Sequence, residues 1–114
     1  MESNLKNFLK NILNLDLEND FIFLKDSNLK YLYANKKFCE LFKLELKDFI
    51  GKDDDFLFED KELVETCKVS DLKALEENYA VKKEIAFGLE FDILKLKVST
   101  GNNKFGVLGF ARFK

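Results

Sequence analysis

The sequence contains no histidine. This absence removes the usual axial ligand of haem iron, the commonest metal ligand and the commonest general base. The chain also lacks any GxSxG, P-loop, HExxH or zinc-binding pattern. No set of residues therefore points to catalysis or to a metal centre.

Cysteine is scarce, with only Cys39 and Cys67, each inside a predicted helix. The pair has no CxxC spacing and no companion ligands. We interpret both as small buried apolar residues, in preference to a disulfide or a metal site. A thiolate could in principle hold haem iron, but nothing in the sequence favours it.

A surplus of one charge is absent too, because charged residues make up 35% of the chain and the net charge is only -2. Nucleic-acid backbones demand a basic surplus, so nucleic acid is a poor candidate partner. No apolar run approaches the ~18 residues of a membrane span, and Lys and Asn interrupt residues 1–13 too often for a signal peptide. With 114 residues, 46% of them hydrophobic, the chain suits a single domain, which we expect in the cytoplasm.

A β-hairpin followed by a helix is the clearest local pattern. The apolar stretches 21–25 and 29–34 flank a polar turn that starts at Asp26. Asn35 then stands where a helix N-cap is expected. The next residues carry Phe38, Leu41 and Phe42 at helical spacing, and a second short turn ends at Gly51.

Three consecutive aspartates, residues 53–55, follow that turn. Carboxylates can hold a divalent cation, but a calcium loop needs spaced ligands and a closing glutamate. We therefore favour a solvated loop and an N-cap. Residues 60–78 form the longest helical pattern, and we expect Ser70 and Asp71 to divide it into two helices because both prefer caps to helix interiors.

The last third of the chain alternates as strands do, over residues 79–87, 89–100 and 104–113. In the middle strand Phe91, Ile93 and Lys95 share one face, while Leu94 shares the other with two more apolar residues. Because both faces carry apolar side chains, we expect both to be covered. An amphipathic stripe within residues 3–13 predicts a helix that covers one face, on its own subunit or across a dimer.

Five segments in this order resemble a PAS domain, a sensory module. They are IFLKDSNLKYLYAN (22–35), DFIGKDDDFLF (48–58), SDLKAL (70–75), FDILK (91–95) and GVLGFAR (106–112). Asn78 stands where members often have glycine, and asparagine also enters the left-handed conformation. The resemblance implies an α+β fold: a five-stranded antiparallel sheet with short helices on one face, and the N-terminal amphipathic helix on the other. Residues 1–19 would be that helix and a linker, and residues 20–114 the PAS domain.

The resemblance also implies a ligand pocket between the sheet and the short helices. The residues that we expect to line it are Phe38, Phe42, Phe56, Phe91, Ile93, Lys95 and Phe110. An inward Lys95 would need a carboxylate partner from the protein or from a ligand. The more ordinary alternative is a lysine that reaches solvent or pairs with Glu84 or Asp92.

The predicted function is a sensory input module of a bacterial signalling protein, which binds a small-molecule metabolite in this pocket. It would relay a signal through its termini to an output domain that we expect to lie outside this chain, in a histidine kinase, a cyclic-dinucleotide enzyme or a chemotaxis transducer. The alternative is a ligandless module that acts in dimerisation and signal relay. We expect a homodimer, no membrane contact and no enzymatic activity. The cysteine motif of flavin photosensors, which resembles NCRFLQ, is replaced by KDDDFLFED. With no cofactor expected, the purified domain should show no haem or flavin absorption band.

Overall fold

The computed structural model describes residues 20–113. Five antiparallel strands form one sheet in the order β2-β1-β5-β4-β3. The strands are β1 (Phe21–Lys25), β2 (Tyr31–Ala34), β3 (Tyr79–Ala86), β4 (Leu89–Gly101) and β5 (Lys104–Phe113). Four helices lie between β2 and β3, namely α2 (Lys36–Phe42), α3 (Leu46–Phe49), α4 (Asp54–Leu57) and α5 (Lys61–Glu77). The α+β architecture predicted from the sequence is thereby confirmed.

Local side-chain chemistry sets the first hairpin and the helix after it. Asp26 Oδ1 accepts hydrogen bonds from the backbone N–H groups of Asn28 (2.9 Å) and Lys30 (3.0 Å), which closes the turn. Asn35 is the N-cap of α2, since its Oδ1 accepts from Phe38 N at 3.0 Å. The same oxygen accepts from Ile22 N at 3.1 Å, so one amide ties β1 to the start of α2.

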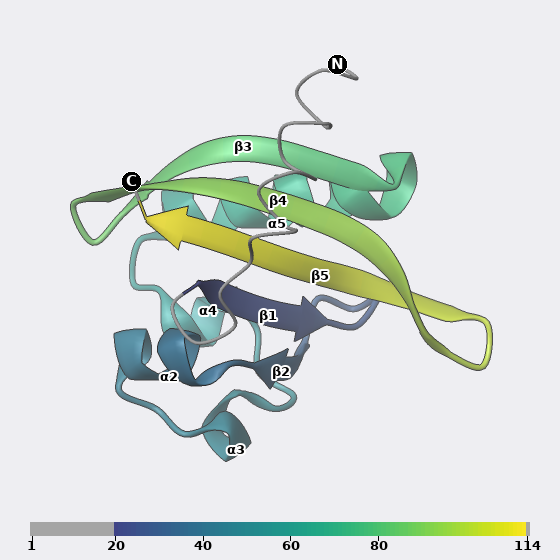
Figure 1. Cartoon of the computed structure of the whole chain (residues 1–114), viewed down its shortest axis with the longest axis horizontal. Coiled ribbons are helices and arrows are strands. Elements are labelled where there is room, and N and C mark those ends of the chain that lie inside the picture. The colour runs from purple at the N-terminus through teal and green to yellow at the C-terminus, as the bar shows by residue number, and fades with distance from the viewer. Residues whose placement is uncertain (1–19, 114) are drawn as a thin grey trace.

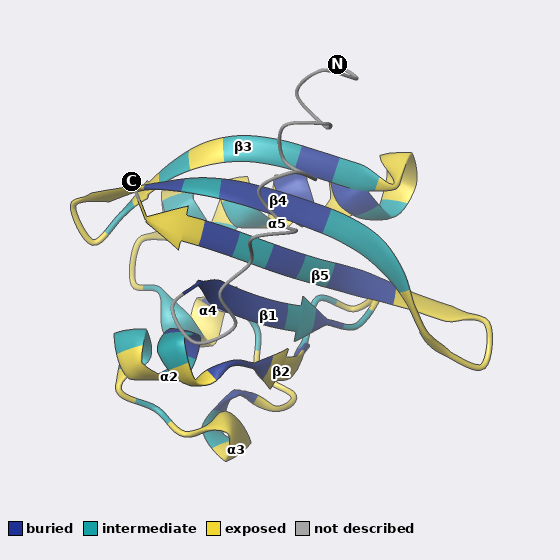
Figure 2. Cartoon of the chain, in the orientation of Figure 1, coloured by how far each residue is buried: buried dark blue, intermediate teal, exposed yellow. Residues whose placement is uncertain are grey.

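The helices lie on one face of the sheet. Figure 1 places α5 behind β3 and β4, with α2, α3 and α4 gathered beside β1 and β2. The main core lies between these layers and is dominated by aromatic rings: Phe21, Phe23, Tyr31, Phe38, Phe49 and Phe91. Buried positions run along the middle strands in Figure 2. Ile22 and Leu94 are also buried; both pair with Phe110 and alternate with the inward residues of their strands, so they point to the opposite face. The helix predicted to cover that face falls within residues 1–19, outside the described residues.

The prediction that Ser70 and Asp71 divide the long helix is wrong. The helix α5 runs unbroken from Lys61 to Glu77, and both residues are buried inside it. Ser70 Oγ donates to Cys67 O at 3.0 Å, and the Asp71 carboxylate binds two lysines of the sheet. These partners outweigh the weak intrinsic preference for caps. Asn78 ends the helix with φ 80°, in the left-handed conformation expected of it.

Within residues 20–113, no helix is long and apolar enough to cross a membrane.

Candidate functional site

An aromatic cavity opens between the helices and the inner face of the sheet. Its volume is about 70 Å³. The rings in its lining are Phe21, Phe23, Tyr31, Phe38, Phe42, Phe58, Phe87 and Phe91. The lining also contains four charged residues, namely Lys25, Asp54, Glu84 and Lys95. Its other residues are Leu41, Leu63, Cys67, Ala86, Ile93 and Ala111. We call this space the aromatic cavity.

The register of the sheet explains which strand residues reach the cavity. Ile93 of β4 pairs with Ala111 of β5, which in turn pairs with Phe21 of β1, and all three lie in the lining. Their i+2 neighbours point to the same face because side chains alternate along a strand. Phe91 and Lys95 therefore flank Ile93 on the inner face, as predicted.

Five of the seven predicted pocket residues lie in the cavity lining: Phe38, Phe42, Phe91, Ile93 and Lys95. The placement predicted for Phe56 is wrong, because its side chain is 51% exposed and lies under the Lys52 ammonium, 5.3 Å from the ring centre. The one-turn helix α4 directs Asp54 inward in its place. The placement predicted for Phe110 is also wrong, because it pairs with Leu94 and so points to the outer face.

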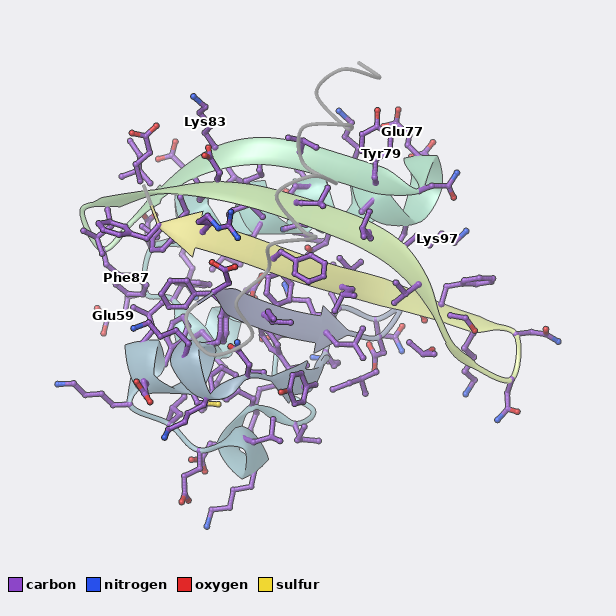
Figure 3. All side chains as sticks on the ribbon, in the orientation of Figure 1. Glu59, Glu77, Tyr79, Lys83, Phe87 and Lys97 are labelled. Carbon is purple, nitrogen blue, oxygen red and sulfur yellow. The ribbon has the colours of Figure 1, made fainter. Side chains whose placement is uncertain are left out.

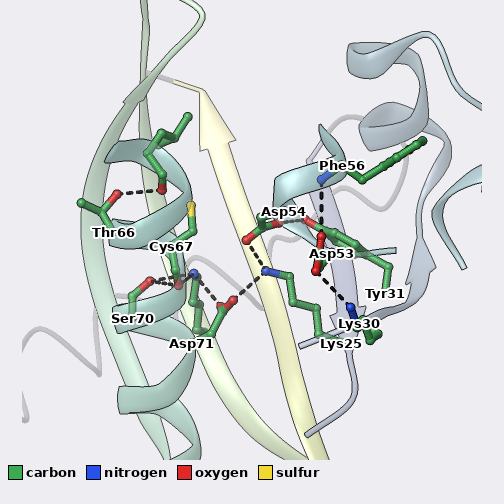
Figure 4. Close-up of polar contacts among 12 residues, drawn as sticks. Lys25, Lys30, Tyr31, Asp53, Asp54, Phe56, Thr66, Cys67, Ser70 and Asp71 are labelled. Carbon is green, nitrogen blue, oxygen red and sulfur yellow. Dashed lines mark hydrogen bonds and ion pairs between the residues drawn. The ribbon is translucent and has the colours of Figure 1, made fainter. Parts of the chain in front are cut away.

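A buried charge cluster consists of Lys25, Asp54, Asp71 and Lys95 (Figure 4). All of these except Asp71 line the aromatic cavity. Lys25 Nζ lies 2.7 Å from Asp54 Oδ2 and 2.6 Å from Asp71 Oδ2. Lys95 Nζ lies 2.7 Å from Asp71 Oδ1. Two ammonium groups thus meet two carboxylates, and Asp71, with 0% of its surface exposed, joins both lysines.

Lys95 does not reach solvent, and its carboxylate partner is Asp71 rather than Glu84 or Asp92. Glu84 pairs instead with Lys82 on the same strand. Lys95 Nζ also donates to Ser70 Oγ at 2.7 Å and to Cys67 O at 3.2 Å. Burial lowers the pKa of Lys95, and Asp71 offsets that effect only in part.

The pKa of Lys25 is shifted in the opposite direction from that of Lys95, because Lys25 has two carboxylate partners. Burial alone would lower the pKa of Lys25, but Asp71 and Asp54 together raise it above the usual value. Its ammonium also lies between two rings, 5.2 Å from the centre of Phe23 and 5.0 Å from that of Tyr31. Tyr31 donates its hydroxyl proton to Asp54 Oδ1 at 2.5 Å.

The aspartate run is only partly the solvated loop that was expected. Asp53 is the N-cap of α4, as predicted, and its carboxylate pairs with Lys30 at 3.0 Å near the surface. Lys30 lowers the pKa of Asp53. Asp54 is buried and belongs to the charge cluster, whereas Asp55 is exposed beside Lys61. Among residues 20–113, no group of side chains is arranged to hold a metal ion.

Sequence reasoning missed Lys25, Tyr31, Asp54 and Asp71. Two signals were available. Lys25 follows Phe21 and Phe23 in the alternation of β1, which directs it inward. Asp71 lies four residues after Cys67 and three before Ala74, so it interrupts the apolar stripe of α5 with a charge.

Alkaline pH should destabilise the fold through Tyr31. Burial and the Asp54 carboxylate raise the pKa of Tyr31 well above its usual value. The folded chain therefore retains the phenol proton at pH values where the unfolded chain loses it. Above pH ~10, this group should lower the free energy of unfolding by up to ~1.4 kcal/mol per pH unit. Lys25, whose pKa is also raised, likewise makes the fold less stable as the pH rises. Lys95, whose pKa is lowered, changes the free energy of unfolding in the opposite direction.

Tyr31→Phe isolates this contribution. The variant should be less stable at pH 7 by about 1.5–3 kcal/mol, since a hydrogen bond to a charged group is lost. Above pH 10, its free energy of unfolding should also fall less steeply with pH than that of the natural chain. The difference in slope should correspond to close to one proton per molecule. Urea unfolding at pH 7, 10 and 11 measures both effects. Parallel pH profiles for the two proteins would contradict the assignment.

Comparison with known proteins agrees with this geometry. A family model described as PAS fold matches residues 15–87. A domain of an HTR-like protein from Haloarcula marismortui superposes with a TM-score of 0.74 at 14% identity, covering 82% of this chain and 96% of that one. A sensory box sensor histidine kinase from Vibrio cholerae gives 0.70 at 14% identity, covering 100% and 98%.

A third structure, the Vibrio cholerae VqmA-ligand-DNA complex, gives a TM-score of 0.68 at 19% identity, covering 92% of this chain and 50% of that one. None of the curated proteins matches this chain significantly. The match of the family model, which spans more than half of the sequence, agrees with the order of strands and helices. The chain belongs to the PAS family.

Proposed function

We propose that this chain is the sensory input module of a signalling protein and that it binds a small ligand in the aromatic cavity. The observation that carries the proposal is a cavity lined by rings and by paired charges. Apolar enclosure with a few placed polar groups is the usual character of a small-molecule site. The ligand present in the VqmA complex is a property of that protein, and it supports the proposal by analogy only.

The buried charge cluster offers a physical route for the signal. Asp71 belongs to α5, Lys25 to β1 and Lys95 to β4, so one carboxylate connects a helix to two strands. A ligand that shifts α5 would have to lengthen ion pairs in a region of low dielectric, where such changes are energetically costly. The position of α5 and the geometry of the sheet would then change together.

The wider context is also part of the proposal. We infer that residues 1–19 form a helix and linker, that residues 20–114 form the sensory domain, and that the module works as a cytoplasmic homodimer. It would relay its signal through its termini to an output domain such as a histidine kinase, a cyclic-dinucleotide enzyme or a chemotaxis transducer. Catalysis has no part in this proposal.

One observation favours the ligandless alternative. All four charges of the cluster have partners within the protein, and the cavity is only about 70 Å³. A core of this kind can be stable without an occupant. In that case the module would act in dimerisation and signal relay without a ligand.

Ala86→Leu separates the two functions. Ala86 lines the cavity, and a larger side chain there should occupy the space that a ligand needs. We expect a small-molecule library to contain compounds that raise the Tm of the natural chain and leave the Tm of this variant unchanged. Lys83→Leu is the matched control, because it adds the same side chain to β3 at a position that points away from the helices in Figure 3. Compounds that stabilise all three proteins equally, or none at all, would favour the ligandless module.

A further inference from the structure

We propose that the aromatic cavity selects a small uncharged ligand, of about the size of a single aromatic ring, and discriminates against anions and cations alike. This inference rests on the proposed function and adds the chemical class of the ligand. Three features of the site carry it: the pairing of its charged groups within the protein, the apolar character of its walls and the cover over its mouth.

The charged groups of the lining already have partners. Lys95 Nζ donates hydrogen bonds to Ser70 Oγ (2.7 Å) and Cys67 O (3.2 Å), and it forms an ion pair with Asp71 Oδ1 at 2.7 Å. Lys25 spans two carboxylates, and Glu84 pairs with Lys82. An anionic ligand would therefore have to displace an internal carboxylate in order to reach either inward lysine.

A cationic ligand meets the mirror-image obstacle. Asp54 accepts from Lys25 and from the Tyr31 hydroxyl, and Asp71 is held by Lys25 and Lys95. The cluster as a whole contains two positive and two negative groups. Any further charge would be buried without a counterion, and burial of an unpaired charge is strongly unfavourable. A neutral molecule avoids this cost.

The walls favour a flat apolar molecule. Rings of Phe21, Phe38, Phe42 and Phe91 surround the space, and aromatic faces attract other rings in offset or edge-on contact. The cavity of about 70 Å³ is roughly half the ~150 Å³ that holds benzene in an engineered protein core. A single ring would fit only with a small outward movement of the lining.

Phe87 is the lining residue best placed for such a movement. It lies in the turn between β3 and β4, its ring is 5.6 Å from that of Phe42 and 6.0 Å from that of Phe58, and 56% of its side chain is exposed. Its φ of 56° is the left-handed conformation, which is unfavourable for a bulky residue. Because Phe87 lines the cavity, is exposed to solvent and lies on a strained turn, we assign its ring as the cover of the space that a ligand would enter. Figure 3 labels it at the end of the sheet beside α2.

Three probes of nearly equal shape test the charge selectivity: benzyl alcohol, benzoate and benzylammonium at pH 7. Each is titrated into the whole chain while the backbone amide resonances are followed by NMR. We expect benzyl alcohol to shift resonances of cavity-lining residues, with a Kd at least tenfold lower than that of either charged probe. Ala86→Leu should abolish those shifts, and Lys83→Leu should preserve them.

The outcomes separate this inference from the proposed function. If benzoate or benzylammonium binds in the cavity as tightly as benzyl alcohol, ligand binding stands and selection for neutral molecules is wrong. If none of the probes and no library compound perturbs the cavity, both proposals fail.

A second experiment tests the size limit with 2-naphthylmethanol, which should bind Phe87→Ala at least tenfold more tightly than the natural chain. Equal affinities would overturn the role of Phe87 as the cover.

Discussion

Replacement of Asp71 by asparagine should cost about 3–5 kcal/mol of the free energy of unfolding. The change keeps the shape of the side chain but removes the charge that holds both Lys25 and Lys95. Because all three groups are buried, the lost interaction cannot be replaced by water. Urea unfolding at pH 7 measures the loss. Small domains have a total stability of only ~5–15 kcal/mol, so this loss is a large fraction of the whole.

The matched control is Asp55→Asn, which makes the same chemical change in an exposed pair with Lys61. Exposed ion pairs contribute about 0–1 kcal/mol to the free energy of unfolding, so this variant should be nearly as stable as the natural chain. A double change, Asp71→Leu with Lys95→Met, should recover much of the loss, because it removes a charge of each sign and leaves Lys25 with Asp54. Equal losses for Asp71→Asn and Asp55→Asn would refute the assignment of Asp71 as the centre of the cluster.

Gly109→Ala should produce the second large effect. A Cβ at this position would lie 2.0 Å from Cζ of Phe23, whose ring lies across β5 against the backbone of Gly109. The buried ring would have to move, and overpacking of this kind typically costs about 1–3 kcal/mol. Phe23 also lies within 6 Å of the Lys25 and Lys95 ammonium groups, so its displacement should disturb the charge cluster as well.

The double variant Gly109→Ala with Phe23→Leu checks this cause. If the ring is the obstacle, the loss caused by the alanine should be smaller in the presence of the leucine, giving a coupling energy of about 0.5–3 kcal/mol. Gly51→Ala serves as the control, because a Cβ there meets no atom within 4 Å and only the positive φ of 79° opposes it. Additive losses from the two changes at positions 23 and 109 would contradict steric conflict between them.

Features governed by neighbouring residues could be predicted from the sequence. The turn at Asp26, the N-cap at Asn35 and the left-handed Asn78 each depend on a few adjacent residues, and the structure confirms all three. Strand alternation likewise predicted that Phe91, Ile93 and Lys95 share a face.

The charge cluster could not be predicted in the same way. It exists only when β1, α4, α5 and β4 come together, and no local pattern states that Lys25 will meet Asp71. Helix propensity pointed in the wrong direction for Asp71, since an isolated aspartate disfavours a helix interior while a buried one with two lysines can stabilise it. Phe56 was misplaced because a four-residue helix offers too few positions to reveal which side is apolar.

The order of the strands bears on how the chain is assembled during its synthesis. β5 lies between β1 and β4 in the sheet, yet it is the last of the five strands to leave the ribosome. Until it emerges, the edges of β1 and β4 that it will occupy have no partner, and unpaired edges of this kind can associate with other chains. Completion of the sheet therefore joins the two ends of the described chain in one step, and the nascent sheet should remain vulnerable to aggregation until β5 is free.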